Sequence, residues 1–255
     1  MAATYATSRD GTRIAYDVLG TGPLLVLVHG LTADRQRWHD AGHVAALSPS
    51  FTVATLDLRG HGESDKPTDP EAYTAEKLLD DLHAVADALN AERFAYWGHS
   101  YGGTIGVQAT AHAPRVTRAV IAGSTFGRQA DQEWLQQGIA QAEMVVGAME
   151  HGQLDALGLD DQDRAAIARF SPHVIRACLK GIATFPGVEP SEARCPTFVY
   201  SGARDHARFA IEAQRPALEA AGIRVEIFDG LDHSQLVSAR DVVLPPVQAF
   251  LQETN

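Results

Sequence analysis

Residues 96–103 read Tyr-Trp-Gly-His-Ser-Tyr-Gly-Gly, and they contain the pattern Gly-x-Ser-x-Gly at positions 98–102. A serine hydroxyl becomes a good nucleophile when a tight strand-to-helix turn projects it, a histidine takes its proton and backbone N–H groups stabilise the oxyanion. Such a turn strains the backbone at Ser100 and requires neighbours almost bare of side chain, which Gly98 and Gly102 provide. The pattern alone is weak evidence for a catalytic serine. A strand before it, a helix after it and catalytic partners elsewhere in the chain are needed to support this interpretation.

The residues on either side of this pattern supply the expected context. Arg93–Trp97 predicts a short strand, and Thr104–His112 predicts a helix that Pro114 stops. Upstream, Leu24–Val28 is a continuous apolar run, which is typical of a strand buried on both faces of a parallel sheet. Phe51–Leu56 predicts a further strand. Ser100 is therefore expected at the junction of a strand and a helix.

The rest of the chain continues this alternation. Val116–Ala122, Pro196–Tyr200 and Val225–Phe228 predict strands separated by helical segments, and Asp10-Gly11 predicts a hairpin turn. Leu236–Leu251 predicts a last helix that its two prolines, 245 and 246, should interrupt or kink. The pattern indicates an α/β fold with a mostly parallel central sheet, flanked by helices and joined by right-handed crossovers.

The alternation stops between residues 126 and 190. Helices are predicted over Gln129–Met149, from Asp160 to about Phe170, and from Ser171-Pro172, a serine N-cap followed by proline at the first helical position. We expect residues 1–125 and 191–255 to form the core, and residues 126–190 to form a small helical lid inserted into it.

Composition sets limits on function and location. The 255 residues carry a net charge of −11, which argues against nucleic acid as a partner. The apolar run Leu24–Val28 is too short to span a membrane, and residues 1–10 lack the apolar centre of a signal peptide. The chain has two cysteines, Cys178 and Cys195, which suit a reducing compartment; a single disulfide bond between them is the alternative. We expect a cytoplasmic protein, monomeric or homodimeric, whose partner is a small-molecule substrate.

Several motifs together resemble the α/β-hydrolase superfamily. They are the 98–102 pattern and, in chain order around it, His29-Gly30, Asp57-Leu58-Arg59-Gly60-His61-Gly62-Glu63-Ser64, Gly202-x-x-Asp205 and His233. The resemblance implies that Ser100 is the nucleophile, His233 the general base and Asp205 the acid that orients it. It also implies an oxyanion hole formed by the backbone N–H groups of Leu31 and Tyr101.

Other residues compete for these roles. Asp229 and Asp232 also lie near His233, but a turn or capping role suits them better. His206 departs from the apolar residue that commonly follows the acid in this family. His39 and His43 have metal-like spacing on a possible helix over 35–47, but no third ligand is placed, so no metal site is predicted.

The substrate pocket is expected to be mostly apolar. Its candidate lining residues are His29, Trp38, Trp134 and Met144. His29 and His61 are more readily structural or pocket-lining than catalytic, and Asp57 and Ser64 are expected to brace loops.

A serine at the elbow excludes the aspartate-based displacement used by haloalkane dehalogenases and epoxide hydrolases of this superfamily. The predicted reaction is hydrolysis of a carboxylic ester, thioester or lactone through an acyl-serine intermediate, with no cofactor. A carbon–carbon bond hydrolase or lyase, a cofactor-free perhydrolase and a non-catalytic ligand receptor remain as alternatives.

Overall fold

A computed structural model describes residues 4–160, 164, 167 and 169–253. In this part of the chain, eight strands form one sheet in the order β1-β2-β4-β3-β5-β6-β7-β8. The hairpin of β1 and β2 is antiparallel, as is the pairing of β2 with β4, and all later pairings are parallel. The expected α/β fold with a mostly parallel central sheet is therefore confirmed.

The strands are short and end where the sequence changes to glycine or polar residues. Their bounds are β1 Thr4–Thr7, β2 Arg13–Leu19, β3 Leu24–Val28, β4 Thr52–Leu56, β5 Phe94–His99, β6 Val116–Ala122, β7 Thr197–Gly202 and β8 Arg224–Phe228. The α-helices are α1 Gln36–Asp40, α2 His43–Leu47, α3 Ala75–Ala88, α4 Tyr101–His112, α5 Glu133–Glu150, α7 Pro172–Ile182, α8 Ala207–Ala220, α9 Gln235–Ser238 and α10 Arg240–Gln252. Short 3₁₀ turns are η1 Pro70–Tyr73, η2 Gln129–Asp131, η3 Leu154–Leu157 and η4 Pro190–Glu192.

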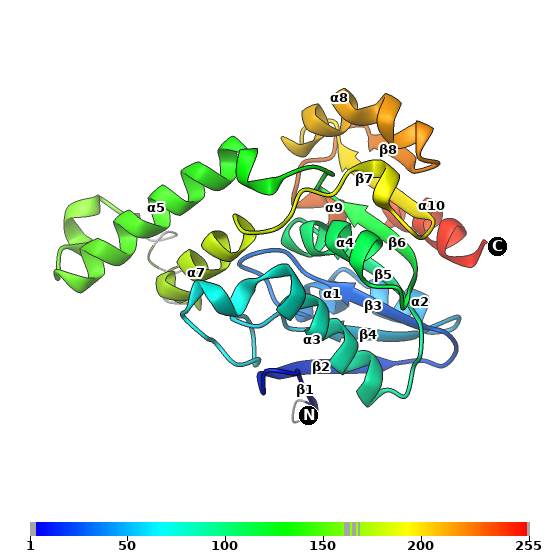
Figure 1. Cartoon of the computed structure of the whole chain (residues 1–255), viewed down its shortest axis with the longest axis horizontal. Coiled ribbons are helices and arrows are strands. Elements are labelled where there is room, and N and C mark those ends of the chain that lie inside the picture. The colour runs from blue at the N-terminus through cyan, green and yellow to red at the C-terminus, as the bar shows by residue number, and fades with distance from the viewer. Residues whose placement is uncertain (1–3, 161–163, 165–166, 168, 254–255) are drawn as a thin grey trace.

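Two hydrophobic cores lie on opposite faces of the sheet, and β3 shows why. Its residues Leu24, Val26 and Val28 pack in the core shared with α3, α4 and α8. Leu25 and Leu27 point the other way, into the core shared with α1, α2, α9 and α10. Successive side chains of a strand alternate between faces, so a strand covered on both sides must be apolar throughout. Figure 1 shows helices on both sides of the sheet.

Two helix predictions differ in detail from the structure. The segment 35–47 divides into α1 and α2 because Gly42 adopts a left-handed conformation, with φ of 76°. The C-terminal segment breaks at Ala239, whereas Pro245 and Pro246 lie inside α10. The helix therefore runs through these prolines without the interruption that was one of the two predicted outcomes, the other being a kink.

Residues 126–190 connect β6 to β7. Within this segment α5 projects away from the sheet, and α7 lies beside it (Figure 1). The helix predicted from Asp160 to Phe170 falls largely outside the described residues. The chain enters and leaves the segment at neighbouring points, because Gly127 forms an antiparallel bridge with Val188.

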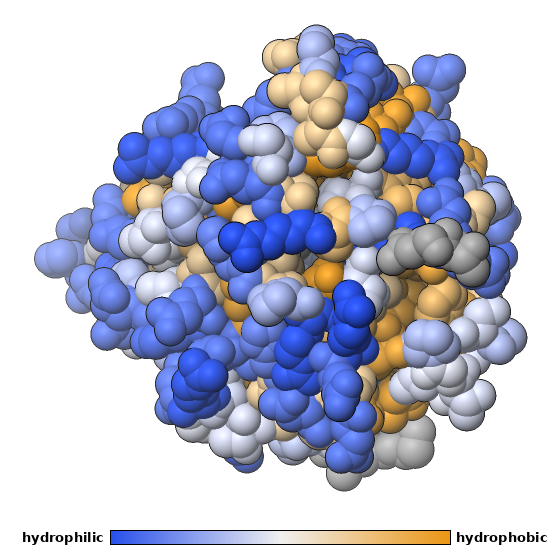
Figure 2. All heavy atoms as spheres, turned by 45° about the vertical axis from the view of Figure 1, so that its right-hand side comes forward, coloured by the Kyte–Doolittle hydropathy of each residue, from blue (hydrophilic) through white to orange (hydrophobic). Residues whose placement is uncertain are grey.

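One face of the molecule is mainly polar. Figure 2 shows a face on which hydrophilic residues predominate, with hydrophobic residues exposed in a band to the right of its centre. In the described ranges no helix combines the length and the apolar character needed to cross a bilayer. Cys178 and Cys195 are both free thiols.

Candidate active site

Ser100 lies at a strained turn between β5 and α4. Its φ of 55° and ψ of −113° are unusual for a residue with a side chain. The turn is compact, because a Cβ atom at Gly98 would overlap the carbonyl oxygen of Gly102, and one at Gly102 would overlap that of Val28. Both glycines of the sequence pattern are therefore required by close backbone approach. This arrangement presents the serine side chain above the end of β5.

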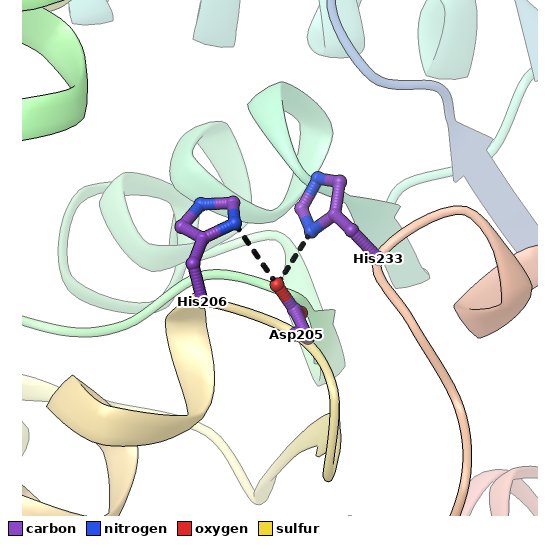
Figure 3. A group of neighbouring side chains, drawn as sticks. All are labelled: Asp205, His206 and His233. Carbon is purple, nitrogen blue, oxygen red and sulfur yellow. Dashed lines mark hydrogen bonds and ion pairs between the residues drawn. The ribbon is translucent and has the colours of Figure 1, made fainter.

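Asp205 and His233 come from the loops that follow β7 and β8. Nδ1 of His233 lies 2.9 Å from Oδ1 of Asp205 (Figure 3). Asp205 also accepts hydrogen bonds from the Ser201 hydroxyl at 2.8 Å and the Ala207 N–H at 3.1 Å. Burial alone would raise the pKa of Asp205, but these bonds, led by that from His233, lower it to about 2. The carboxylate is thus ionised and placed to fix the orientation of the His233 ring.

Backbone bonds hold these two loops together. The N–H of Arg204 donates to the carbonyl oxygen of Leu231 at 2.9 Å, and the N–H of Ala203 donates to that of Phe228 at 2.8 Å. Asp232, considered above as a competing acid, instead accepts a bond from the N–H of Gln235 at 2.9 Å. This is the capping role expected for it.

His99 is a site residue that the sequence did not single out. Its side chain is buried, and its ring centroid lies 4.8 Å from that of His233. Nε2 of His99 lies 2.8 Å from the carbonyl oxygen of His233, to which it donates. Burial, reinforced by the neighbouring His233, lowers the pKa of His99 to about 3, so the ring is neutral. The signal available in the sequence was its position inside the 98–102 pattern, which says nothing of what its side chain contacts.

Ser100 and His233 open into one cavity of about 120 Å³. Asp205 occupies Nδ1 of His233, which leaves Nε2 as the nitrogen available to a substrate or to the serine. Among the described residues no hydrogen bond joins the Ser100 hydroxyl to His233. Such bonds often form only when a substrate is present. The two groups therefore share a cavity in an open geometry.

The expected oxyanion donors border the same cavity. Leu31 and Tyr101 both line it, and Tyr101 is the first residue of α4. Their backbone N–H groups donate to no acceptor in the described part of the chain. These two N–H groups, one at a helix N-terminus and one in a neighbouring loop, can donate hydrogen bonds to an oxyanion and so stabilise a developing negative charge.

The cavity has both apolar and polar lining residues. Leu31, Trp134 and Ile182 supply apolar surface, while Thr104 and Ser124 share a hydrogen bond of 2.9 Å. The other lining residues are Gly123, Thr125, Gln129, Gln132, His206, Ala207 and Ala210. Sequence reasoning did not single out the hydroxyl groups of Thr104, Ser124 and Thr125.

Of the four predicted pocket residues, Trp134 lines the cavity and three do not. Trp38 is 1% exposed and packs edge-on against Trp97 in the core beneath the site. His29 is fully buried and accepts a bond at Nε2 from the N–H of Leu58, so it braces two loops. Met144 is 54% exposed on α5. These three predictions are corrected accordingly.

The Asp57-to-Ser64 motif stabilises the loop after β4. Asp57 accepts bonds from the N–H groups of Arg35 and Glu63 and also pairs with the guanidinium of Arg35. The Ser64 hydroxyl donates to the Asp57 carbonyl at 2.7 Å. His61 is buried, and burial lowers its pKa to about 3. These contacts match the bracing role expected from the sequence.

His39 and His43, which have metal-like spacing in the sequence, each contact a partner of their own. Nε2 of His39 lies 3.1 Å from the Thr55 hydroxyl, and Nε2 of buried His43 donates to the Val237 carbonyl at 2.7 Å. Potential ligand atoms of Asp205, His206 and His233 instead lie within 4.8 Å of one another. The side chains that could together ligate a metal therefore lie at the candidate acid and base, and not on the α1–α2 segment.

Comparisons with known proteins agree with this fold. The family model of the alpha/beta hydrolase fold matches residues 23–171. The chain is 35% identical over 103 residues to the 2-(acetamidomethylene)succinate hydrolase of Mesorhizobium japonicum, an alignment covering 40% of this chain and 36% of that protein. In general the chain spans between 22% and 40% of the length of the curated relatives it matches.

Solved structures resemble almost the whole chain. The enol-lactonase from Burkholderia xenovorans LB400 superposes with a TM-score of 0.73 at 27% identity, covering 98% of this chain and 100% of that one. A thermophilic esterase from Thermogutta terrifontis has a TM-score of 0.77 at 22% identity, covering 99% and 98%, and shares the fold. From its fold, the elbow at Ser100 and the match over residues 23–171, the chain belongs to the α/β-hydrolase fold family.

Proposed function

We propose that the protein is a serine hydrolase that cleaves a carboxylic ester, thioester or lactone through an acyl-serine intermediate. The observation that carries this proposal is the 2.9 Å contact between Asp205 and His233 at the edge of the cavity into which Ser100 projects. An ionised, buried carboxylate on Nδ1 directs the free Nε2 of the imidazole toward that cavity. Binding alone would not require this set of groups.

The reaction follows from the positions of these groups. The Ser100 oxygen attacks the substrate carbonyl carbon while Nε2 of His233 takes the hydroxyl proton. The N–H groups of Leu31 and Tyr101 stabilise the oxyanion, and collapse of the tetrahedral intermediate breaks the bond to the leaving oxygen or sulfur, which receives the proton from His233. Water then attacks the acyl-serine by the same route and releases the carboxylic acid. The ionised Asp205 stabilises the imidazolium in both halves.

The cavities favour a substrate with a small acyl group and an apolar extension. The 120 Å³ cavity is small, but Leu31 and Trp134 also line a groove of about 350 Å³ between α5 and α7. That groove is bordered by apolar side chains such as Val145, Ile175 and Leu179. We therefore assign residues 126–190 the role of a lid over the site. The similarity to an enol-lactonase supports a lactone as one substrate class to test.

The direct test is the variant Ser100→Ala assayed with p-nitrophenyl esters of increasing acyl length. Loss of a nucleophile should reduce kcat to near the background rate, with the fold unchanged by circular dichroism. Thr104→Ser, which keeps a hydroxyl in the same cavity, is the matched control and should retain turnover. Undiminished hydrolysis by Ser100→Ala would exclude the acyl-serine mechanism.

A second test identifies the acylated atom. A fluorophosphonate should label the native protein with one equivalent, and peptide mass spectrometry should place the label on Ser100. A panel of esters, thioesters and lactones then separates the substrate classes by kcat/KM. Labelling at another serine would contradict the assignment.

A further inference from the structure

Two imidazoles face the same carboxylate oxygen at this site. Nδ1 of His233 lies 2.9 Å from Oδ1 of Asp205, and Nδ1 of His206 lies 3.2 Å from the same atom. Figure 3 shows both rings turned toward the carboxylate, with His206 at the start of α8 and His233 in the loop beyond β8. The His206 contact requires a separate explanation, since Asp205 needs one histidine for catalysis.

His206 is not needed to hold the carboxylate. The Ser201 hydroxyl and the Ala207 N–H already donate to Asp205, one to each oxygen. The His206 side chain is 59% exposed, whereas that of Asp205 is fully buried. His206 therefore adds an accessible nitrogen to a site whose hydrogen bonds are otherwise complete.

The three groups form a ligand set suited to zinc. Zinc is bound in proteins by imidazole nitrogens and carboxylate oxygens about 2.0–2.2 Å away, so ligands of a tetrahedral ion are about 3.3 Å apart. The separations of 2.9 Å and 3.2 Å at Asp205 are close to this value, and no pair of ligand atoms exceeds 4.8 Å. The His206 ring, which is 59% exposed, is the ligand that must turn to close the remaining gap.

The ligands are also in suitable protonation states. Burial lowers the pKa of His206, against the opposing effect of Asp205 and with a smaller contribution from the neighbouring His233, which favours the neutral ring. The Asp205 carboxylate is ionised. Metal binding requires neutral imidazole and ionised carboxylate.

Occupation of this site would disable the base. A metal on Nδ1 of His233 replaces the proton that this nitrogen shares with Asp205. The neutral ring then carries its one proton on Nε2, the nitrogen that must accept the proton of Ser100. A ring in that tautomer cannot act as the general base.

We propose that Asp205, His206 and His233 form a binding site for zinc, and that zinc bound there reversibly blocks catalysis. The site itself rests on the geometry of the three side chains. Its inhibitory effect rests in addition on the hydrolase function proposed above.

The test begins with zinc binding to the EDTA-treated full chain, measured by isothermal titration calorimetry in a non-chelating buffer. One equivalent of zinc should bind to the wild-type protein. In metal sites the loss of even an outer-shell partner costs about 10–100-fold in affinity, so His206→Gln should weaken binding by at least about 10-fold. His112→Gln, which changes an exposed histidine at the far end of α4, is the matched control and should bind as the wild type does.

The same proteins are then assayed for ester hydrolysis, each relative to its own zinc-free rate. Zinc should inhibit the wild type and His112→Gln, with reversal by EDTA, and His206→Gln should need at least about 10-fold more zinc. Equal zinc affinity in wild type and His206→Gln, or no binding to the wild type, would overturn the proposal. Zinc binding that depends on His206 in a protein with no hydrolytic activity would instead uphold the site and refute the proposed function.

Discussion

The Nε2–H of His99 donates a hydrogen bond to the backbone carbonyl oxygen of His233, 2.8 Å away. The residue before the candidate nucleophile thus holds the loop that carries the candidate base. Replacing His99 by Phe removes the donor and should lower kcat by about 10–100-fold through misplacement of His233, with little change in KM. Steady-state kinetics on a p-nitrophenyl ester would measure both constants.

Rescue by a conservative variant distinguishes positioning from simple loss of packing at His99. His99→Gln keeps an N–H donor and should recover part of the lost kcat, whereas His99→Phe keeps ring volume without the donor. Equal kcat values in the two variants would mean that the hydrogen bond has no positioning role.

Asp205 should be far more sensitive to substitution than the residue that supports it. Asp205→Asn removes the charge that fixes the His233 tautomer, and comparable changes in serine hydrolase triads reduce kcat by about 10⁴-fold. Ser201→Ala removes one bond to Oδ2 and should have a much smaller effect. A similar loss of kcat in both variants would show that Asp205 acts through local structure and not through His233.

The buried pair of Arg59 and Asp81 should dominate the charge contribution to stability. Both side chains are fully buried and lie 2.6 Å apart. Asp81→Asn leaves a buried guanidinium partly uncompensated and should lower the free energy of unfolding by about 3–5 kcal/mol. The exposed pair of Arg13 and Asp65 provides the control, and Asp65→Asn should change stability little. Urea denaturation of both variants would test this contrast.

Acid should destabilise the fold through its buried histidines, and His43 offers a clear test. Burial, opposed by the bond to the Val237 carbonyl, lowers the pKa of His43 from 6.5 to about 4. The unfolded chain binds the proton first as pH falls, so stability is full above pH 6.5 and declines between 6.5 and 4. At pH 4, protonation of His43 in the unfolded chain should by itself lower the free energy of unfolding by about 3 kcal/mol.

His43→Gln retains a donor for Val237 but does not titrate, so it isolates this effect. Its free energy of unfolding should approach and then exceed that of the wild type as pH falls through the same window. Urea midpoints at pH 8, 6 and 4.5 would measure the difference. A stability difference that does not vary with pH would contradict the account.

The parts of the fold that follow from local pattern were predictable. Leu24–Val28 is apolar throughout because both faces of β3 are covered. A continuous apolar run of this length therefore predicts a buried strand from the sequence alone. Gly98 and Gly102 are likewise dictated by backbone contacts within a few residues of Ser100 or on the adjoining strand. Asp205 and His233 could be named because their motifs resemble those of the α/β-hydrolase superfamily and each follows a predicted strand.

The parts that depend on tertiary packing were not predictable. Trp38 and Met144 are both apolar residues on helices, and their sequence does not say that one packs against Trp97 while the other faces solvent. His206 is next to Asp205 in the chain, yet only the start of α8 turns its ring back toward the carboxylate. The direction in which each of these side chains points depends on three-dimensional packing, so the sequence pattern did not indicate it.

The bridge between Gly127 and Val188 has a consequence for the way this protein can diversify. The segment between these residues begins and ends at one point beside β6 and β7, two strands that are already paired to each other. Exchange of everything between them would leave the register of the sheet and the loops of Ser100, Asp205 and His233 untouched. On the lid role proposed above, replacement of this one segment would change substrate preference while Ser100, Asp205 and His233 keep their places.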